Sequence, residues 1–116
     1  MSPKRGEVWW VNLDPAVGSE QAKTRPVVVV SADGIGKLPL RIVVPCTDWK
    51  PHYGTYPWFI HLPAQASNGL QKDSGADAFQ VRSLSLERFV RRAGRLDDGS
   101  IGEIAAAIAL CVDYEG

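Results

Sequence analysis

The stretch GSEQAKTRPVVVV, residues 18–30, decides the fold, because a polar loop turns there into the most apolar run of the chain. Four consecutive valines bounded by turn-forming residues indicate a strand that is buried on both faces. Pro26 fits the first position of this strand, where it removes no ladder hydrogen bond. Arg25 is then held at the mouth of a rigid central strand, which limits how far its charge can move. The alternative is an ordinary loop arginine in contact with solvent.

Length and composition are those of one globular domain, residues 1–116. No apolar run approaches the ~20 residues that a membrane-spanning helix needs, and the N-terminal residues lack the apolar core of a signal peptide. The two cysteines, Cys46 and Cys111, lie far apart and show no metal-ligand spacing. We therefore expect a cytoplasmic protein with no membrane association, in which both thiols are buried.

The net charge is zero, but the charges are unevenly distributed along the chain. All 13 basic residues lie at or before Arg95, together with only 8 of the 13 acidic residues, so the remaining segment is purely acidic. Five arginines fall between Arg82 and Arg95, with only Glu87 to oppose them. A basic surface of this kind suits an anionic polymer. A solvated surface of mixed charge is the alternative interpretation.

Short apolar or alternating runs predict strands at residues 7–13, 27–30, 41–47, 58–62, 77–84 and 89–93. Pro45 lies inside the third run, which indicates an edge strand or the end of that strand. In the fifth run, alternation directs Phe79 and Val81 to the core and turns Gln80 and Arg82 outward together.

The last segment has the pattern of an amphipathic helix. Ser100 and Glu103 stand in capping-box spacing, just after two acidic residues that favour a helix N-terminus. An apolar stripe at helical spacing, which we expect to pack against the sheet, consists of Ile104, Ala107, Ile108, Cys111 and Val112. The predicted fold class is mainly β with a C-terminal helix (α+β), with a small, strongly bent antiparallel sheet or partly open barrel.

Two long loops carry polar and aromatic side chains. The loop that leads to Arg25 is longer than a hairpin turn, and loops of that kind are often functional. The loop of residues 48–57 interleaves aromatic side chains such as Trp49 with Lys50 and His52. This mixture can stack unpaired bases and screen phosphates. Alternatively, the loop is held in place by its own aromatic rings.

Several motifs together resemble the MazF/PemK family of toxin endoribonucleases from type II toxin–antitoxin systems. They are RGEVWWVNLDP at residues 5–15, GSEQ at 18–21, TRPVVV at 24–29, VPCT at 44–47 and QVRS at 80–83. The resemblance covers essentially the whole chain. It implies an SH3-like, CcdB-like barrel that forms a homodimer and is neutralised by a cognate antitoxin. It also implies cleavage of single-stranded RNA without a metal or other cofactor, leaving 2′,3′-cyclic phosphate and 5′-hydroxyl ends.

The resemblance places the catalytic arginine and threonine of the family at Arg25 and Thr47. Arginine offers a rigid fork of donors for phosphoryl oxygens, and threonine can donate one more hydrogen bond. Glu20, the only nearby carboxylate that the sequence indicates, is a candidate for proton transfer or RNA positioning. The further candidate RNA-binding residues, chosen by family position or by their place in the two loops and beside Gln80, are Asp14, Ser19, Lys23, Trp49, Lys50, Gln80 and Arg82.

Other chemistries and functions find less support. His52 and His61 form no evident catalytic pair, and no carboxylate cluster offers ligands for a hard metal ion. A CcdB-like gyrase-poisoning toxin is one alternative, but its gyrase contact depends on a tryptophan near the C-terminus, and Trp58 is the last one here. A non-catalytic RNA-binding barrel is another. Asn12, where many family members carry Asp, and the loop of residues 48–57 depart from the family pattern, so the recognised RNA sequence is not predicted.

Overall fold

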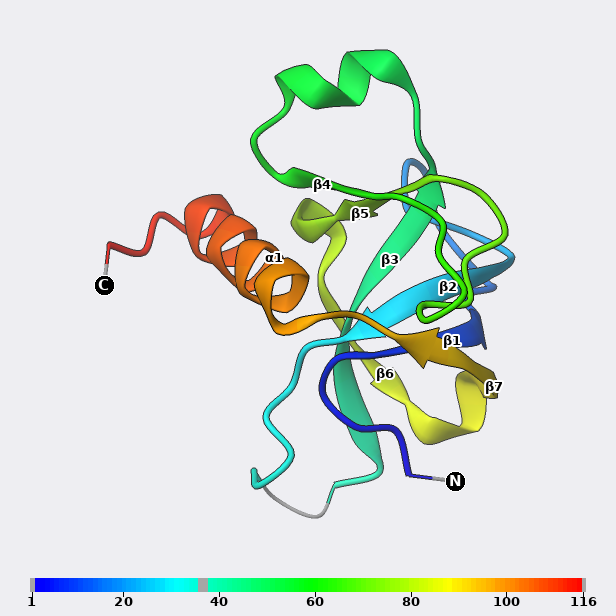
Figure 1. The fold of residues 1–116 in the computed structure, drawn as a ribbon. Helices are drawn as coiled ribbons and strands as arrows, with labels where there is room; N and C mark the ends of the chain where they lie inside the picture. The colour runs from blue at the N-terminus through cyan, green and yellow to red at the C-terminus, as the bar shows by residue number, and fades with distance from the viewer. Residues whose placement is uncertain (1, 36–37, 116) are drawn as a thin grey trace.

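The centre of the fold consists of strands β1 (Glu7–Asn12), β2 (Thr24–Val29) and β3 (Leu40–Asp48). The structure is a computed structural model, and it describes residues 2–35 and 38–115 (Figure 1). The remaining strands are β4 (Phe59–Leu62), β5 (Ser74–Asp77), β6 (Arg82–Ser85) and β7 (Phe89–Arg95). The antiparallel sheet has the order β4-β5-β3-β2-β1-β7, and β6 also pairs with β3. The ends of the predicted domain, Met1 and Gly116, lie outside the described residues.

The valine run lies between two parts of the core, which explains why it is apolar without alternation. Val28 and Val30 belong to one buried cluster, and Val27 and Val29 belong to a second cluster on the opposite face of the strand. The predicted burial on both faces is therefore confirmed. The prediction for Pro26 is wrong, because β2 begins at Thr24 and Pro26 pairs with a residue of β1 inside the ladder.

Strand β3 is central, so the prediction that Pro45 marks an edge or a strand end is wrong. Pro45 pairs with Val27 of β2 on one side. On the other side, residues 40–43 pair with β6 and residues 46–48 pair with β5. Pro45 sits where β3 changes partner, and the missing N–H therefore interrupts neither of these two ladders.

The predicted strand at residues 77–84 is interrupted by a 3-10 turn, η2 (Ala78–Gln80), between β5 and β6. The carboxylate of Asp77 accepts a hydrogen bond from the Phe79 N–H at 3.2 Å, which turns the chain out of β5. Phe79 is 66% exposed rather than buried, so its predicted position in the core is wrong. Val81 is partly buried against the core, as the alternation predicted.

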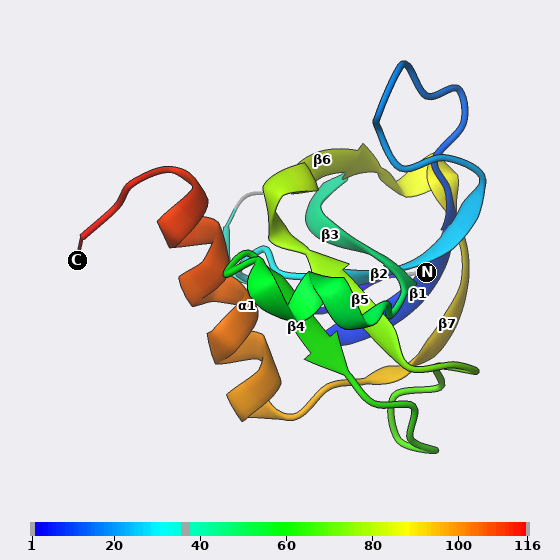
Figure 2. The same ribbon diagram turned by 90° about the horizontal axis from the view of Figure 1, so that it is seen from above.

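The C-terminal helix α1 (Asp98–Cys111) covers one side of the sheet and packs on β4 and η2 (Figure 2). Its N-cap is Asp97, whose carboxylate accepts from the Ser100 N–H at 2.7 Å, so the predicted cap at Ser100 is wrong. The buried residues of the helix are Ile101, Ile104 and Ala107, whereas Val112 is 68% exposed. No described helix is long and apolar enough to cross a membrane.

The predicted fold class is confirmed as mainly antiparallel β-sheet with one C-terminal helix. The sheet bends strongly, because successive parts of β3 pair with β6 and with β5 (Figure 2). Within residues 2–35 and 38–115, β4 and β7 end the order of strands and do not pair with each other, so closure into a barrel is not detected.

Candidate active site

The register of β2 against β3 brings the two predicted catalytic residues together. Val27 pairs with Pro45, and continuing this antiparallel register by two residues places Arg25 opposite Thr47 on the same face. The Arg25 guanidinium donates from Nη1 to Thr47 Oγ1 at 3.4 Å. Its Nε donates to the backbone carbonyl of Ala22 at 3.1 Å. The guanidinium is therefore oriented by one strand residue and one loop carbonyl.

A cleft of about 200 Å³ surrounds this pair. Trp10, Asp48 and Lys72 are among its lining residues, and none of them was predicted for the site. Asp48 lies 3.7 Å from Lys72, and within residues 2–35 and 38–115 no carboxylate lies within ion-pair distance of Arg25. The positive charge of Arg25 is thus available to an anion. Trp10 reaches the cleft because β1 pairs with β2, where Trp10 lies opposite Pro26, and the sequence gives no signal for this pairing.

Cys46 also lines the cleft, but its thiol is unsuited to nucleophilic chemistry. The side chain is completely buried, in agreement with the prediction. Burial raises the pKa of the Cys46 thiol to about 12, so the group stays neutral near pH 7. Cys111, which was also predicted to be buried, is only partly buried.

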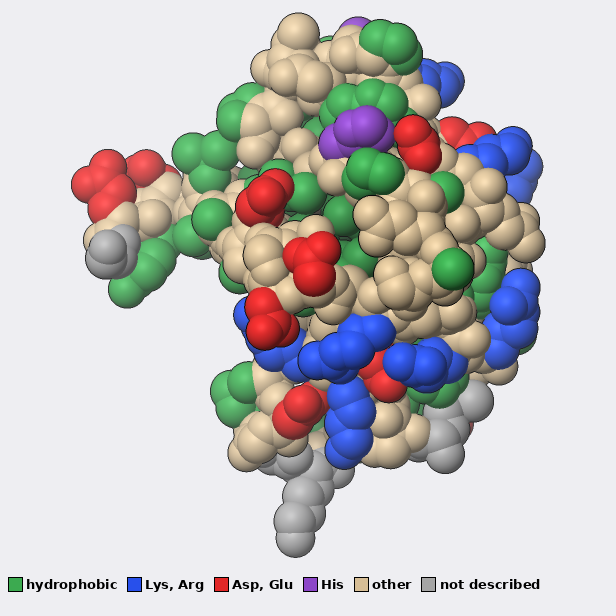
Figure 3. Space-filling model, viewed as in Figure 1, with side chains coloured by type: hydrophobic (Ala, Val, Ile, Leu, Met, Phe, Trp, Pro, Cys, Tyr) green, Lys and Arg blue, Asp and Glu red, His purple; other side chains and the backbone are tan. Residues whose placement is uncertain are grey.

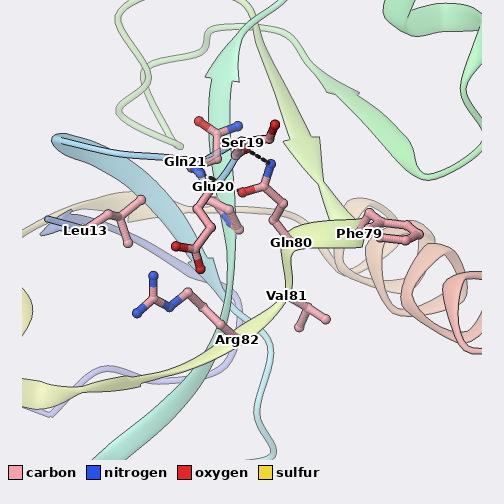
Figure 4. Close-up of a pocket in the computed structure, with 9 residues that line it drawn as sticks. Leu13, Ser19, Glu20, Gln21, Phe79, Gln80, Val81 and Arg82 are labelled. Atoms are coloured by element: carbon pink, nitrogen blue, oxygen red, sulfur yellow. Dashed lines mark hydrogen bonds between the residues drawn. The ribbon is translucent and has the colours of Figure 1, made fainter. Parts of the chain in front are cut away.

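A second and larger pocket, of about 560 Å³, contains Ser19, Glu20, Gln80 and Arg82 (Figure 4). The structure therefore brings these four predicted residues together, but in a different pocket from Arg25 and Thr47. Glu20 lines this second pocket and not the cleft around the pair. Phe79 lines the same pocket, with its ring directed away from the loop (Figure 4).

Gln80 is already engaged within the protein. Its Oε1 accepts from the Gln21 N–H at 2.6 Å, and its Nε2 donates to the Ser19 carbonyl at 3.2 Å (Figure 4). Nε2 also donates to Asp77 at 3.2 Å. Burial raises the pKa of the Asp77 carboxyl, although hydrogen bonds from Phe79 and Gln80 act in the opposite direction. The amide of Gln80 thus ties the loop between β1 and β2 to η2.

Two predicted site residues, Asp14 and Glu20, form hydrogen bonds within the loop between β1 and β2. Asp14 Oδ1 accepts from the Lys23 N–H at 2.9 Å, and Glu20 Oε1 accepts from the Val17 N–H at 2.7 Å. Lys23 has a positive φ of 68° and an exposed side chain. Gly18, at φ 60°, supplies the second left-handed position of the loop. The carboxylates of Asp14 and Glu20 therefore shape the loop, while Lys23 faces solvent.

The loop of residues 48–57 is held by its own aromatic rings, which was one of the two interpretations left open. Trp49 stacks on His61 with 4.3 Å between ring centroids, and Tyr53 stacks on Phe59 at 4.2 Å. Residues 51–55 form the 3-10 turn η1 (Pro51–Thr55), and Lys50 is the exposed residue before it.

The arginines between Arg82 and Arg95 are distributed over β6, η3 (Leu86–Arg88) and β7. Figure 3 shows basic side chains gathered over β7 and the N-terminal segment. Arg92 forms an ion pair with Glu7 at 2.8 Å, and Arg91 lies over the Trp10 ring at 5.3 Å. Trp10 also lines the Arg25 cleft, so the basic surface adjoins the candidate active site.

Comparison with known proteins identifies relatives along almost the whole chain. Residues 4–112 match the family model described as the PemK-like, MazF-like toxin of type II toxin–antitoxin systems. The endoribonuclease MazF9 of Mycobacterium tuberculosis is 39% identical over 95% of this chain and 96% of its own length. A crystal structure of MazF from Deinococcus radiodurans has a TM-score of 0.83 at 23% identity, covering 98% of this chain and 99% of that one. A MazE–MazF structure from the same organism has a TM-score of 0.75 at 24% identity, with 99% of each chain covered.

Proposed function

Since the chain belongs to the PemK-like, MazF-like toxin family of type II toxin–antitoxin systems, we propose that Arg25 and Thr47 carry out metal-independent cleavage of single-stranded RNA. The chain is a MazF-like endoribonuclease. The observation that supports it most is the contact between the Arg25 guanidinium and Thr47 Oγ1 at 3.4 Å inside a cleft. An arginine without a carboxylate partner in the described part of the chain is suited to bind phosphate.

In the proposed reaction, the 2′-hydroxyl oxygen of a ribose attacks the adjacent phosphorus, and the bond from phosphorus to the 5′-oxygen breaks. The products are a 2′,3′-cyclic phosphate and a 5′-hydroxyl, so the proton lost by the 2′-hydroxyl is balanced by the proton gained by the 5′-oxygen. Negative charge grows on the phosphoryl oxygens in the transition state, where preorganised donors lower the barrier. Holding the phosphate in line with the 2′-hydroxyl supplies a further part of the rate.

The Arg25 guanidinium has enough N–H donors to bind a phosphate in addition to its contacts within the protein. A guanidinium has five N–H groups, of which one is directed at Ala22 and one at Thr47. The remaining three can bind phosphoryl oxygens. Thr47 Oγ1 accepts from Arg25, so the hydroxyl proton of Thr47 remains free to donate to a further oxygen.

RNA binding is proposed for the side chains that border the two pockets and the neighbouring loops. Lys23 and Lys50 are exposed cations that can contact phosphates, and Arg82 and Ser19 border the larger pocket. Trp49 has one ring face occupied by His61. Of the two roles considered for Glu20, positioning fits better than proton transfer, because Glu20 lies in a different pocket from Arg25 and Thr47.

We propose the antitoxin and the homodimer as partners. Relatives are described as MazE–MazF and as an endoribonuclease in complex with its cognate antitoxin, so we infer a MazE-type antitoxin for this chain. The homodimer rests on the family resemblance alone, and light scattering tests it. A stable monomer at micromolar concentration would contradict the dimer.

The proposed chemistry is tested by incubating purified protein with a long single-stranded RNA in the presence of a chelator. The expected result is discrete cleavage, with cyclic phosphate on one end of each cut and a 5′-hydroxyl on the other. Sequencing of the ends then gives the recognised motif. Cleavage that stops on chelation, or that leaves a 5′-phosphate, would reject the proposed chemistry. Binding without cleavage by the folded protein would favour a non-catalytic RNA-binding function.

A further inference from the structure

The side chain of Gln80 connects the tip of the loop between β1 and β2 with the sheet. Its amide makes hydrogen bonds to the backbone of Gln21 and to the backbone of Ser19 (Figure 4). A third hydrogen bond runs from the amide to the carboxylate of Asp77. A primary amide has two donor hydrogens and two acceptor lone pairs. Both donors and one acceptor position are therefore in use, which leaves little capacity for reading a nucleobase.

Asp77 fixes the orientation of this amide. It is the last residue of β5, is 6% exposed and pairs with Phe59 of β4. An ionised carboxylate only accepts hydrogen bonds, so the Nε2 end of Gln80 faces Asp77 and its Oε1 end faces the Gln21 N–H. The second oxygen of Asp77 accepts from the Phe79 N–H at 3.2 Å. A buried group of the sheet thus directs both ends of the Gln80 amide at the loop.

The loop tip in turn leads to Arg25. Ala22 follows Gln21 directly, and its carbonyl accepts from Arg25 Nε at 3.1 Å. Nη1 of the same guanidinium contacts Thr47 Oγ1 at 3.4 Å. A displacement of residues 19–22 would therefore move the carbonyl that orients the guanidinium.

Apart from the bond from Arg25 to the Ala22 carbonyl, the other side-chain hydrogen bonds of this loop do not connect its tip to the sheet. The bonds of Asp14 to Lys23 and of Glu20 to Val17 are internal to the loop. Arg88 donates to the carbonyls of Asn12 and Asp14, which lie at the base of the loop. Among the described residues, the side-chain hydrogen bonds that connect residues 19–21 to another element all come from Gln80, which lies in η2.

We propose that Gln80 is a positioning residue, which holds residues 19–22 so that the Ala22 carbonyl orients Arg25 for catalysis. This inference rests on the proposed role of Arg25 in RNA cleavage. It differs from a direct contact between Gln80 and RNA, because Gln80 then acts through Arg25 on the rate of the chemical step. It predicts that loss of the amide lowers kcat, leaves KM and the cleaved sequence unchanged, and loosens residues 19–22.

The test compares Q80M, which keeps the length of the side chain and removes its hydrogen bonds, with Q65M at an exposed glutamine between β4 and β5. For Q80M we expect a fall of ~10–100-fold in kcat, the size produced by a small misplacement of a catalytic group. We also expect faster hydrogen exchange at the Gln21 amide. Q65M should match wild type in both measurements. Q80L, which also removes every hydrogen bond of the amide, carries the same test if Q80M does not fold.

Unchanged exchange at the Gln21 amide in Q80M would overturn the proposal. So would an altered cleavage motif or a raised KM at unchanged kcat, since either result would identify Gln80 as a direct contact to RNA. If the wild-type protein cleaves no RNA, the proposed function fails, and the exchange measurement still decides whether Gln80 holds the loop.

Discussion

Arg25→Lys separates the charge of Arg25 from its geometry. Both side chains carry one positive charge, but lysine has three N–H donors on one atom, whereas the guanidinium has five on a planar fork. Two donors of Arg25 are engaged with Ala22 and Thr47. The arginine therefore offers three further donors to a phosphoryl group, and a lysine that kept both contacts would offer one.

We expect the rate of the chemical step to fall about 10²–10³-fold in Arg25→Lys, which corresponds to roughly 2.7–4 kcal/mol of transition-state stabilisation. Affinity for RNA should change much less, because the charge that attracts phosphate is retained. The assay is single-turnover cleavage of a short labelled RNA, with affinity measured separately. Arg95→Lys is the matched control, since Arg95 is exposed and donates to the backbone carbonyl of Arg5 outside both pockets.

A rate close to that of wild type in Arg25→Lys would refute the argument, because it would mean that charge alone is sufficient. An equal loss of rate in Arg95→Lys would also refute it, since the effect would then not depend on the Arg25 cleft.

Further predictions concern stability and reactivity. Gly94→Ala should destabilise the fold by ~1–3 kcal/mol, because the new Cβ would lie 2.4 Å from a backbone carbon of the neighbouring loop; Gly102→Ala, with nothing within 4 Å, should stabilise it by ~0.5–1 kcal/mol. Chemical denaturation measures both, and equal effects would contradict the close approach. The Cys46 thiol, with its pKa raised to about 12, should resist alkylation at pH 8 until the protein unfolds, as mass spectrometry can show. Burial acts to raise the pKa of Glu7, but hydrogen bonds including that from Arg92 lower it overall. Glu7→Gln should therefore lower the free energy of unfolding by up to about 1 kcal/mol at neutral pH, after allowing for solvent screening. This difference in stability between variant and wild type should vanish as acid protonates Glu7. A difference that persists in acid would contradict the prediction.

The local sequence pattern was sufficient to predict those features that depend on neighbouring residues alone. The valine run was predictable because β-branched residues without alternation suit a strand with apolar neighbours on both faces. The pairing of Arg25 and Thr47 was expected from the family resemblance, and the register of β2 against β3 supplies its geometry. Val81 is partly buried against the core as predicted, although it follows the 3-10 turn η2 and does not continue a strand.

The errors arose where tertiary structure decides between local alternatives. Pro45 is tolerated in a central strand because β3 exchanges β6 for β5 at that point, which no local signal records. The alternating pattern predicts a core position for Phe79, but β5 ends at Asp77, whose carboxylate accepts a hydrogen bond from the Phe79 N–H. Asp97 and Ser100 are both good N-cap residues, and the structure selects the earlier one.

The division of the candidate site into two pockets could also not be predicted from the sequence. Glu20 and Arg25 are close along the chain, yet they line different pockets. Their separation depends on how the loop folds back on Gln80, a contact across 59 residues of sequence.

The central claim is that Arg25 and Thr47 act together on the phosphate of RNA. Its most direct test is the single-turnover cleavage rate of wild type, Arg25→Ala, Thr47→Ala and the double variant. The account predicts a loss of about 10²–10³-fold or more for each single variant, with little further loss in the double variant because the two residues act as a unit. Cleavage at the wild-type rate by either single variant, with the fold intact, would contradict the account.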